Sequence, residues 1–347
     1  MEQRTDDSRV WRAPSIIDVA REAGVSAQTV SRVANGMDIV RPATRDKVLA
    51  AMDRLGYRPN SAARALKSGR FRTLGVIMSG LSSYGNMHTL EAIANEAARE
   101  GYSLALTPLW TIAQAGFTGA FARLADQAVD GVLVVLEARA LNDADLAQIA
   151  GIPTVVVTAG DSHPYPSIDI DQAQGARLAT EHLLELGHET VWHIRGPENS
   201  YSAEDRATSW ADTLRAHGRS VPPVLWGDWS TASGYEAGRR LAADPDVTAV
   251  FAANDEMALG VLRAMRDAGR LVPESVSVVG FDDMEMAADF QPPLTTIHQY
   301  FDRVGTAAVG MLVDQIERRP LTPPGLVATA LVTRASTAAP PTSPPAV

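Results

Sequence analysis

The sequence predicts an α/β protein in which an N-terminal helix-turn-helix domain precedes two doubly wound α/β subdomains. Over residues 15–57, apolar residues recur at helical spacing on either side of a short glycine-containing turn. From Thr73 onward, short apolar runs alternate with helical patterns in two similar halves, as in parallel sheets that helices cover on both faces. A chain of 347 residues also suits two or three domains better than one.

The helical domain is expected over residues 15–57. Its first helix has one apolar face, formed by Ile16, Val19, Ala20 and Ala23. Gly24 should end that helix, and Ser26 is a good N-cap for a second helix over about 27–34. Pro42 suits the start of a third helix, where its missing N–H costs nothing. Two helices joined by a short turn, the second with a polar outer face, form the arrangement that reads DNA.

Polar or proline-rich segments flank and connect the domains. Residues 1–14 carry scattered charges without periodicity, and residues 336–347 are rich in Pro, Ser and Ala. We therefore expect both tails to be disordered. Residues 58–72 link the helical domain to the body and include a short helix-compatible stretch from Asn60 to Leu66.

The body is expected over residues 73–335. The predicted strands are 74–78, 103–107, 131–136, 154–157, 191–194, 249–252 and 277–280. The predicted helices are 90–99, 117–128, 144–150, 173–186, 205–216, 235–242 and 257–268. A final strand, helix and strand follow between Thr295 and Thr333. Two halves of this kind suit two doubly wound subdomains, whose ligands bind beyond the carboxyl ends of the strands.

Charge is divided unevenly along the chain. Residues 1–72 carry 14 Lys and Arg against 8 Asp and Glu, whereas the remaining residues carry 17 against 33. A basic head on an acidic body is what nucleic-acid binding through one end requires. The absence of cysteine excludes disulfides and thiol catalysis. Because the sequence lacks both a long apolar run and a signal-peptide core, we expect a cytoplasmic, nucleoid-associated protein with no membrane partner.

The run from Asp18-Val-Ala through Asn60 to Leu66 closely resembles the head-piece of the LacI/GalR family of bacterial transcription regulators, and the resemblance extends from about Ser15 to Thr337. It implies a sugar-responsive repressor, released from a palindromic operator by a neutral mono- or disaccharide. The body would be of the periplasmic-binding-protein type. Its N-subdomain would comprise about 73–168 and 300–325, and its C-subdomain about 169–299 and 326–335. We also expect a homodimer, because one helix-turn-helix buries too little surface for specific binding.

The resemblance and the chemistry of base recognition together predict the DNA contacts. Gln suits adenine, Arg suits guanine and Ala can meet a thymine methyl, so Ala27, Gln28 and Arg32 should read bases. The residues expected to hold phosphates or order the turn are Ser26, Thr29, Ser31 and Asn35. The resemblance adds Tyr57, Asn60, Ala63 and Leu66. It makes Leu66 a minor-groove wedge on a hinge helix, although Leu66 could also be merely the apolar side of a short helix.

Polar and aromatic residues follow the predicted strands of the body, in a pattern that resembles the family's effector pocket. The matching residues are Ser79, Tyr84, Arg206, Trp229, Asn254, Asp282 and Phe301. Of these, Arg206, Asn254 and Asp282 match positions that grip sugar hydroxyls. Trp229 and Phe301 match apolar walls. Where many family members place an acidic or amide ligand contact, this chain has Thr158, so a galactoside effector is not implied.

Structural roles and other functions also suit parts of this pattern. Asn254, Asp255 and Asp282 could each cap a helix, and Trp229 could be plain core. A periplasmic sugar-binding protein would share the two-lobed fold, but it would lack a DNA-binding head and carry a signal peptide. An enzyme is suggested by Asp282-Asp283 and by His182, His188 and His193. Their spacing does not suit a metal and the common catalytic motifs are missing, so we expect no catalytic residue, metal or cofactor.

Overall fold

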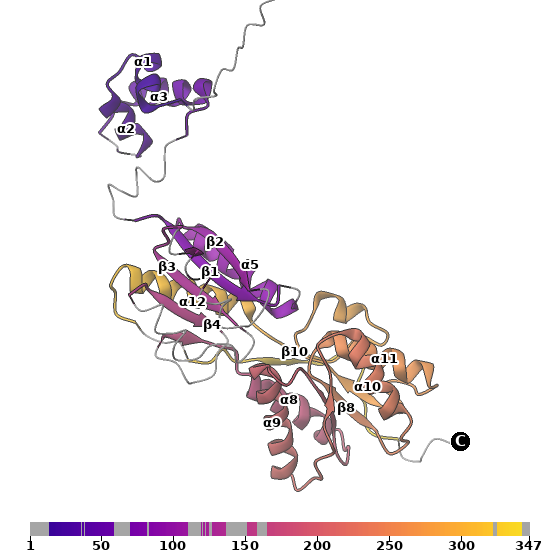
Figure 1. Ribbon diagram of the computed structural model, residues 1–347. Helices are drawn as coiled ribbons and strands as arrows, with labels where there is room; N and C mark the ends of the chain where they lie inside the picture. Colours follow the sequence, from indigo (N-terminus) through magenta and orange to yellow (C-terminus); the bar gives the residue numbers. More distant parts are fainter. Residues whose placement is uncertain are drawn as a thin grey trace, which may run out of the picture. The chain divides into compact units, whose positions relative to one another are not determined.

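The computed structural model describes residues 14–35, 37, 39–58, 70–81, 83–109, 119, 121, 123–124, 127–136, 151–157, 165–321 and 325–341. The chain divides into two compact units, Met1–Phe71 and Arg72–Val347, called here the head and the body. Figure 1 shows the helical head and the α/β body. The predicted fold class is confirmed. The predicted helices at 117–128 and 144–150 lie largely or wholly outside the described residues, as do the N-terminal tail and most of the hinge.

The head contains α1 (Ile16–Ala23), α2 (Ala27–Ala34) and α3 (Pro42–Leu55), as the sequence predicts. Ser15 and Asp18 form a capping box at the start of α1. Gly24 ends α1 in the left-handed conformation, with φ of 65°. Ser26 caps α2 by accepting a hydrogen bond from the Thr29 amide at 3.1 Å. The core between the helices consists of Val19, Ala20, Val30, Val33, Val40, Val48, Ala51 and Met52.

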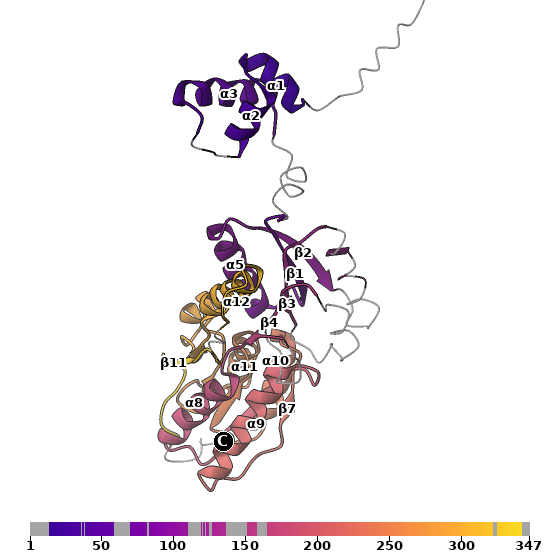
Figure 2. The ribbon, with the colours of Figure 1, turned by 90° about the vertical axis from the view of Figure 1, so that its left-hand side faces the viewer.

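The N-terminal lobe of the body is built on a five-stranded parallel sheet in the order β2-β1-β3-β4-β5. The strands are β1 (Thr73–Ser79), β2 (Ser103–Leu109), β3 (Gly131–Val135), β4 (Thr154–Val157) and β5 (Ser167–Ile168). Helices α5 (Tyr84–Arg99) and α12 (Phe301–Ile316) pack against each other over this sheet (Figures 1 and 2). Because β1, β3 and β4 are almost wholly buried, their sequences are continuous apolar runs.

The C-terminal lobe has a four-stranded parallel sheet in the order β7-β6-β8-β9. Its strands are β6 (Trp192–Arg195), β7 (Leu225–Trp226), β8 (Ala249–Ala252) and β9 (Ser277–Val279). Its helices are α8 (Gln172–Glu185), α9 (Tyr201–Ala216), α10 (Thr231–Ala242), α11 (Asp255–Asp267) and the short η1 (Glu285–Asp289). Helices α8 and α9 form one buried cluster with the sheet, while α10 and α11 form another. This is the helix-on-both-faces arrangement of a doubly wound fold.

The chain crosses between the two lobes three times. The first crossing joins β5 to α8, the second is β10 (Thr296–His298), and the third leads to β11 (Ala330–Val332). β10 and β11 pair antiparallel, so the second and third crossings are bonded to each other. The first and third are also bonded, because the Asp171 amide donates to the Val327 carbonyl and the Val327 amide donates to the Asp169 carbonyl.

The prediction that residues 336–347 form a disordered tail is wrong for residues 336–341. Ser336 is fully buried, and its carbonyl oxygen accepts a hydrogen bond from the Val278 amide at 2.8 Å. Ser336 Oγ also donates to the Val278 carbonyl at 2.6 Å. Because β9 is the edge of its sheet, these residues supply the backbone partners that β9 would otherwise lack. Tertiary pairing thus orders a segment whose composition predicts disorder.

No helix within the described ranges is long and apolar enough to span a membrane.

Candidate functional site

The outer face of α2 presents the side chains that the sequence predicts to read bases. Ala27, Gln28 and Arg32 are exposed, and the side chains of Gln28 and Arg32 make no hydrogen bond or ion pair with another described residue. Such side chains are available to base edges in a major groove. Their common face follows from the spacing of residues 28 and 32, one turn of helix apart.

The neighbouring polar residues of the head order its turns. Ser26 Oγ and Thr29 Oγ1 lie 2.9 Å apart at the start of α2. Asn35 ends α2, where its Nδ2 donates to the Ser31 carbonyl at 2.7 Å. Tyr57 packs against the core of the head. The predicted contacts Asn60, Ala63 and Leu66 lie outside the described residues.

A pocket with about 610 Å³ of space outside protein atoms, including its opening to solvent, lies between the two lobes of the body. The N-terminal lobe contributes Ser83, Tyr84, Gly85, Asn86, Thr89, Phe301 and Val304. The crossings and the C-terminal lobe contribute Ile170, Gln172, Ser202, Arg206, Trp229, Asn254, Glu256, Asp282 and Gln299. Convergent polar groups with aromatic walls are typical of small-molecule sites.

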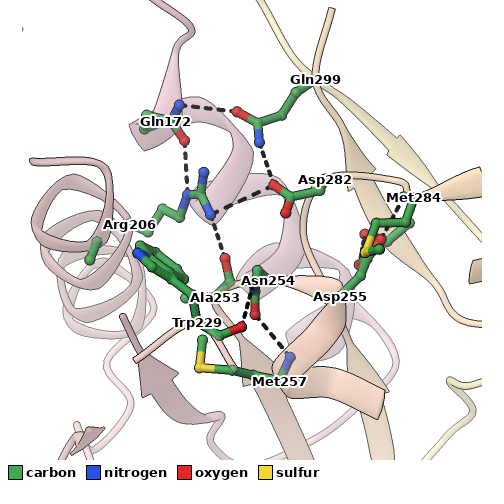
Figure 3. A network of polar contacts seen from close by, with 12 residues as sticks. Gln172, Arg206, Trp229, Ala253, Asn254, Asp255, Met257, Asp282, Met284 and Gln299 are labelled. Carbon is green, nitrogen blue, oxygen red and sulfur yellow. Dashed lines mark hydrogen bonds and ion pairs between the residues drawn. The ribbon is translucent and has the colours of Figure 1, made fainter. Parts of the chain in front are cut away.

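Arg206 is the centre of a buried hydrogen-bond network in this pocket (Figure 3). Its Nε donates to Gln172 Oε1 at 2.8 Å, and its Nη1 donates to the Ala253 carbonyl. Gln172 Nε2 donates to Gln299 Oε1 at 3.0 Å, and Gln299 Nε2 donates to Asp282 Oδ1 at 2.5 Å. Arg206 Nη1 lies 4.0 Å from Asp282 Oδ1, which closes the ring. A buried guanidinium and carboxylate are thereby both supplied with partners.

Aromatic rings of the C-terminal lobe lie beside the guanidinium. The Arg206 Cζ atom is 3.7 Å from the centre of the Phe281 ring and 5.6 Å from that of Trp229. Trp229 has φ of 74°, and its ring lies so close to Gly196 that a β-carbon there would overlap it. Arg206 is itself buried, with only 4% of its surface exposed.

Asn254 joins the end of β8 to α11. Its Oδ1 accepts a hydrogen bond from the Met257 amide at 2.9 Å, so it is the N-cap of α11. Its Nδ2 donates to the Trp229 carbonyl at 3.0 Å (Figure 3). Asn254, and not Asp255, is thus the cap, and the same side chain holds the Trp229 loop against the pocket.

Asp255 is a buried carboxyl beneath the pocket. Its Oδ1 accepts from Thr296 Oγ1 at 2.5 Å and its Oδ2 accepts from the Met284 amide at 2.8 Å. Burial raises the pKa of Asp255 to about 7, with Asp283 adding to the rise and the hydrogen bonds from Thr296 and Met284 opposing it. The carboxyl ties α11 to the second crossing and to the loop that carries Asp282.

The loop from Asp282 to Met284 is fastened to β10. The Asp282 amide donates to the Ile297 carbonyl at 2.8 Å. Asp283 accepts from His298 Nδ1 at 2.9 Å and from an Arg334 nitrogen at 2.6 Å. Asp282 and Asp283 have φ of 116° and 56°, conformations that cost energy for residues with a β-carbon. Neither residue caps a helix; the loop is held in a strained form that turns Asp282 toward Arg206.

An aromatic group on the N-terminal lobe faces the same pocket. The Tyr84 ring is 3.9 Å from the His88 ring and 6.1 Å from the Phe301 ring, centre to centre. Burial raises the pKa of Tyr84, and the carboxyls of Asp282 and Asp255 raise it further, so its hydroxyl stays protonated. Tyr84 also packs against the core of the C-terminal lobe, which makes it a contact between lobes.

Most of the predicted effector residues meet in this pocket. Those that line it are Tyr84, Arg206, Trp229, Asn254, Asp282 and Phe301. Ser79 is not among the lining residues; it is buried, and its carbonyl oxygen accepts a hydrogen bond from Asn86 Nδ2 at 2.9 Å. Thr158 lies outside the described residues. Gln172 and Gln299 also line the pocket but were not predicted from the sequence. The one sequence feature that marks them is a polar residue next to each of two crossings.

The three candidate histidines are apart from this pocket. His182 and His188 contact the C-terminal segment, through Thr337 Oγ1 at 3.0 Å and the Ala338 carbonyl at 3.0 Å. Burial lowers the pKa of His193 to about 3, and its Nδ1 lies 2.9 Å from the Phe251 carbonyl. Across the described residues, no group of three or more His, Cys, Asp or Glu could hold a metal ion.

A helix-turn-helix head joined to a two-lobed body with an interlobe pocket defines a ligand-binding transcription regulator. A family model for bacterial regulatory proteins of the lacI family matches residues 15–60, and one for a periplasmic binding protein-like domain matches residues 180–337. The lactose operon repressor of Escherichia coli strain K12 is 34% identical over 333 residues, which cover 94% of this chain and 91% of that protein. The chain belongs to the LacI family. It is a DNA-binding regulator and not an enzyme.

Two solved structures show the same architecture. One is the lac repressor dimer bound to operator and the anti-inducer ONPF, with a TM-score of 0.87 and 34% identity, covering 94% of this chain and 100% of that one. The other is a complex of the transcriptional regulator CelR with cellobiose, with a TM-score of 0.68 and 34% identity, covering 93% and 99%.

Proposed function

We propose that this regulator is a repressor that leaves a palindromic operator when a neutral mono- or disaccharide enters its interlobe pocket. The pocket carries the proposal, because it combines polar side chains of the C-terminal lobe with the aromatic rings of Tyr84, Trp229 and Phe301. Saccharides present hydroxyls that need hydrogen-bond partners and C–H faces that pack on rings. The similarity to a cellobiose-bound regulator supports this class of ligand.

The charges of the pocket favour a neutral ligand. Its charged lining residues are Arg206, Glu256 and Asp282, which together carry one more negative than positive charge. Arg206 is already hydrogen-bonded to two neutral groups and lies 4.0 Å from Asp282. A phosphorylated sugar would need further cationic donors for its phosphate.

The pocket also suggests how ligand binding reaches the DNA. Its lining comes from both lobes, so a ligand that contacts both favours one closure angle over others. In the proposed homodimer, a change of closure would alter how well two heads fit two half-sites. The predicted hinge residues Asn60, Ala63 and Leu66 would transmit that change.

Replacing Gln28 with alanine should weaken binding to the operator far more than binding to unrelated DNA. A bidentate contact to adenine discriminates by about 1–3 kcal/mol, and Gln28 is exposed without a partner in the described head. The operator can be selected from a random duplex library and then titrated with wild type and with the variant. The same titration gives the number of protein chains bound per operator, which we expect to be two. Equal losses on both DNAs would make Gln28 a backbone contact, and one chain per site would contradict the dimer.

Replacing Asn254 with serine should make the repressor insensitive to its saccharide without unfolding it. Serine is itself a good N-cap, so α11 keeps its cap, while the amide that holds the Trp229 carbonyl is lost. A thermal-shift screen of neutral mono- and disaccharides, with cellobiose among them, identifies the ligand on wild type. That ligand is then titrated into operator complexes of both proteins. Equal release of both would place the effector elsewhere, and release of neither would contradict induction.

A further inference from the structure

The amide bridge between Gln172 and Gln299 has a fixed direction. Arg206 can only donate hydrogen bonds, and the carboxylate of Asp282 can only accept them. Gln172 must therefore turn its oxygen to Arg206 and its nitrogen to Gln299, and Gln299 must turn its nitrogen to Asp282. The three bonds run in one direction from a cation to an anion, so each polarises the next.

The bridge also joins two crossings between the lobes. Gln172 is the first residue of α8, directly after the first crossing, and Gln299 directly follows β10 in the second. Both side chains are 4% exposed. Backbone hydrogen bonds already join the first crossing to the third and the second to the third. The Gln172–Gln299 bond at 3.0 Å links the first crossing to the second, inside the pocket.

The amides keep the guanidinium and the carboxylate from closing on each other. Arg206 and Asp282 approach to 4.0 Å, longer than the paired bonds of a bidentate ion pair. Gln172 accepts the hydrogen bond from Arg206 Nε, and Gln299 donates to Asp282 Oδ1. These are two of the atoms that a bidentate ion pair between Arg206 and Asp282 could use. A hydroxyl both donates and accepts, so neighbouring hydroxyls suit a separated donor and acceptor.

We propose that Gln172 and Gln299 are positioning residues for the effector, which hold Arg206 and Asp282 at the separation that a pair of neighbouring ligand hydroxyls requires. The proposal rests on the saccharide function proposed above. Without the two amides, Arg206 and Asp282 can approach each other and no longer match the spacing of the ligand hydroxyls. The hydrogen bond between the first and second crossings is also lost. Saccharide affinity should fall as a result, and release of operator by saccharide should need correspondingly more ligand.

Gln174 offers a matched control on the same helix. Its Oε1 accepts from the Thr329 amide at 2.6 Å and from Thr329 Oγ1 at 3.0 Å, so it too joins α8 to a crossing. Gln174 does not line the pocket. Gln174→Met removes hydrogen bonds of the same kind, so it reports the cost of losing a crossing contact without disturbing Arg206 or Asp282.

The test compares Gln172→Met, Gln299→Met, Gln172→Glu and Gln174→Met in the full chain. Cellobiose and a panel of neutral mono- and disaccharides are titrated, with Tm measured alone and with each sugar. We expect the first three variants to bind the active saccharide about 10-fold or more weakly, with Gln174→Met unchanged. Gln172→Glu preserves the size of the side chain, but a carboxylate can only accept hydrogen bonds. The Gln299 amide would then donate to it and present its oxygen to the carboxylate of Asp282. Without ligand, the decrease in Tm of the variant that carries both Gln172→Met and Gln299→Met should be smaller than the sum of the decreases in the two single variants.

Three outcomes would overturn the positioning role. They are unchanged affinity in the bridge variants, equal weakening in Gln174→Met, and additive Tm losses in the double variant. If no saccharide shifts the Tm of wild type, the saccharide function itself fails, and the positioning role falls with it.

Discussion

A chain that ends at Ala335 should be markedly less stable than the full chain, even though it loses only twelve residues, 336–347. The missing residues are those that hydrogen-bond to the edge strand β9. Val278 would lose the partners of both its amide and its carbonyl, and the Thr295 amide would lose Ser336 Oγ, which it reaches at 2.8 Å. Further hydrogen bonds disappear between Ala338 and Ser277, at 3.0 Å in both directions.

The expected loss is on the order of 5 kcal/mol, since each of these bonds contributes roughly 1 kcal/mol net. That is a large share of the stability of an ordinary domain, typically about 5–15 kcal/mol. Urea unfolding and the Tm of the two proteins measure it. A chain that ends at Pro341 is the control, because it retains all these contacts. If the two shortened chains were equally stable, residues 336–341 would contribute nothing to the fold. The uncovered β9 edge should also make the shorter chain prone to aggregation.

This segment shows where sequence-based prediction fails. Its Pro, Ser and Ala residues have neither helical nor strand periodicity, so composition alone predicts disorder. Its order depends on partners far away in sequence, at β9 and at His182 and His188. In the sequence alone, those histidines suggest possible catalytic groups. Burial lowers the pKa of both. Both rings contact the C-terminal segment, and His188 also contacts the hydroxyls of Thr248 and Ser277, which indicates a structural role.

Local patterns predicted much more of the head and of the sheets. Ser26 and Gly24 mark helix ends through rules that depend on a few neighbouring residues. The apolar strands of the body were likewise recognisable, because burial on both faces leaves a continuous apolar run. Errors of a few residues occur at helix starts, where polar residues of the first turn interrupt the apolar pattern; α9, for example, begins at Tyr201 and not at residue 205.

The pocket was only partly predictable for a related reason. Asn254 and Asp282 follow β8 and β9, and Arg206 lies near the start of α9, so topology alone brings them together. Gln172 directly follows the first crossing and Gln299 directly follows β10, and a single polar residue at such a place has no periodic context in the sequence. Whether Asn254 or Asp255 caps α11 also depends on backbone geometry that adjacent residues in the sequence do not distinguish.

Replacing Asp255 with alanine should destabilise the body strongly, whereas replacing it with asparagine should be tolerated. Alanine leaves the Met284 amide and the Thr296 hydroxyl buried without an acceptor, at a cost of about 1–3 kcal/mol each. Asparagine can accept from the Met284 amide through its oxygen. Its NH₂ group can donate to Thr296 Oγ1, because a hydroxyl can reverse its role. The loop that carries Asp282 would then keep its position, so Asp255→Asn should still bind the effector.

The dependence of stability on pH should distinguish the protonated from the ionised form of Asp255. Burial raises its pKa from 3.8 to about 7, so between these values the folded state holds a proton that the unfolded state releases. Its contribution to stability is therefore fully present below about pH 4 and is lost as pH rises through 7. Asparagine cannot titrate, so the free energy of unfolding of Asp255→Asn should fall less between pH 5 and 8 than that of wild type. Some slope should remain, because burial also raises the pKa of Asp169 to about 7. If Asp255→Asn kept the full slope and lost as much stability as Asp255→Ala, the carboxyl would be ionised in the folded protein.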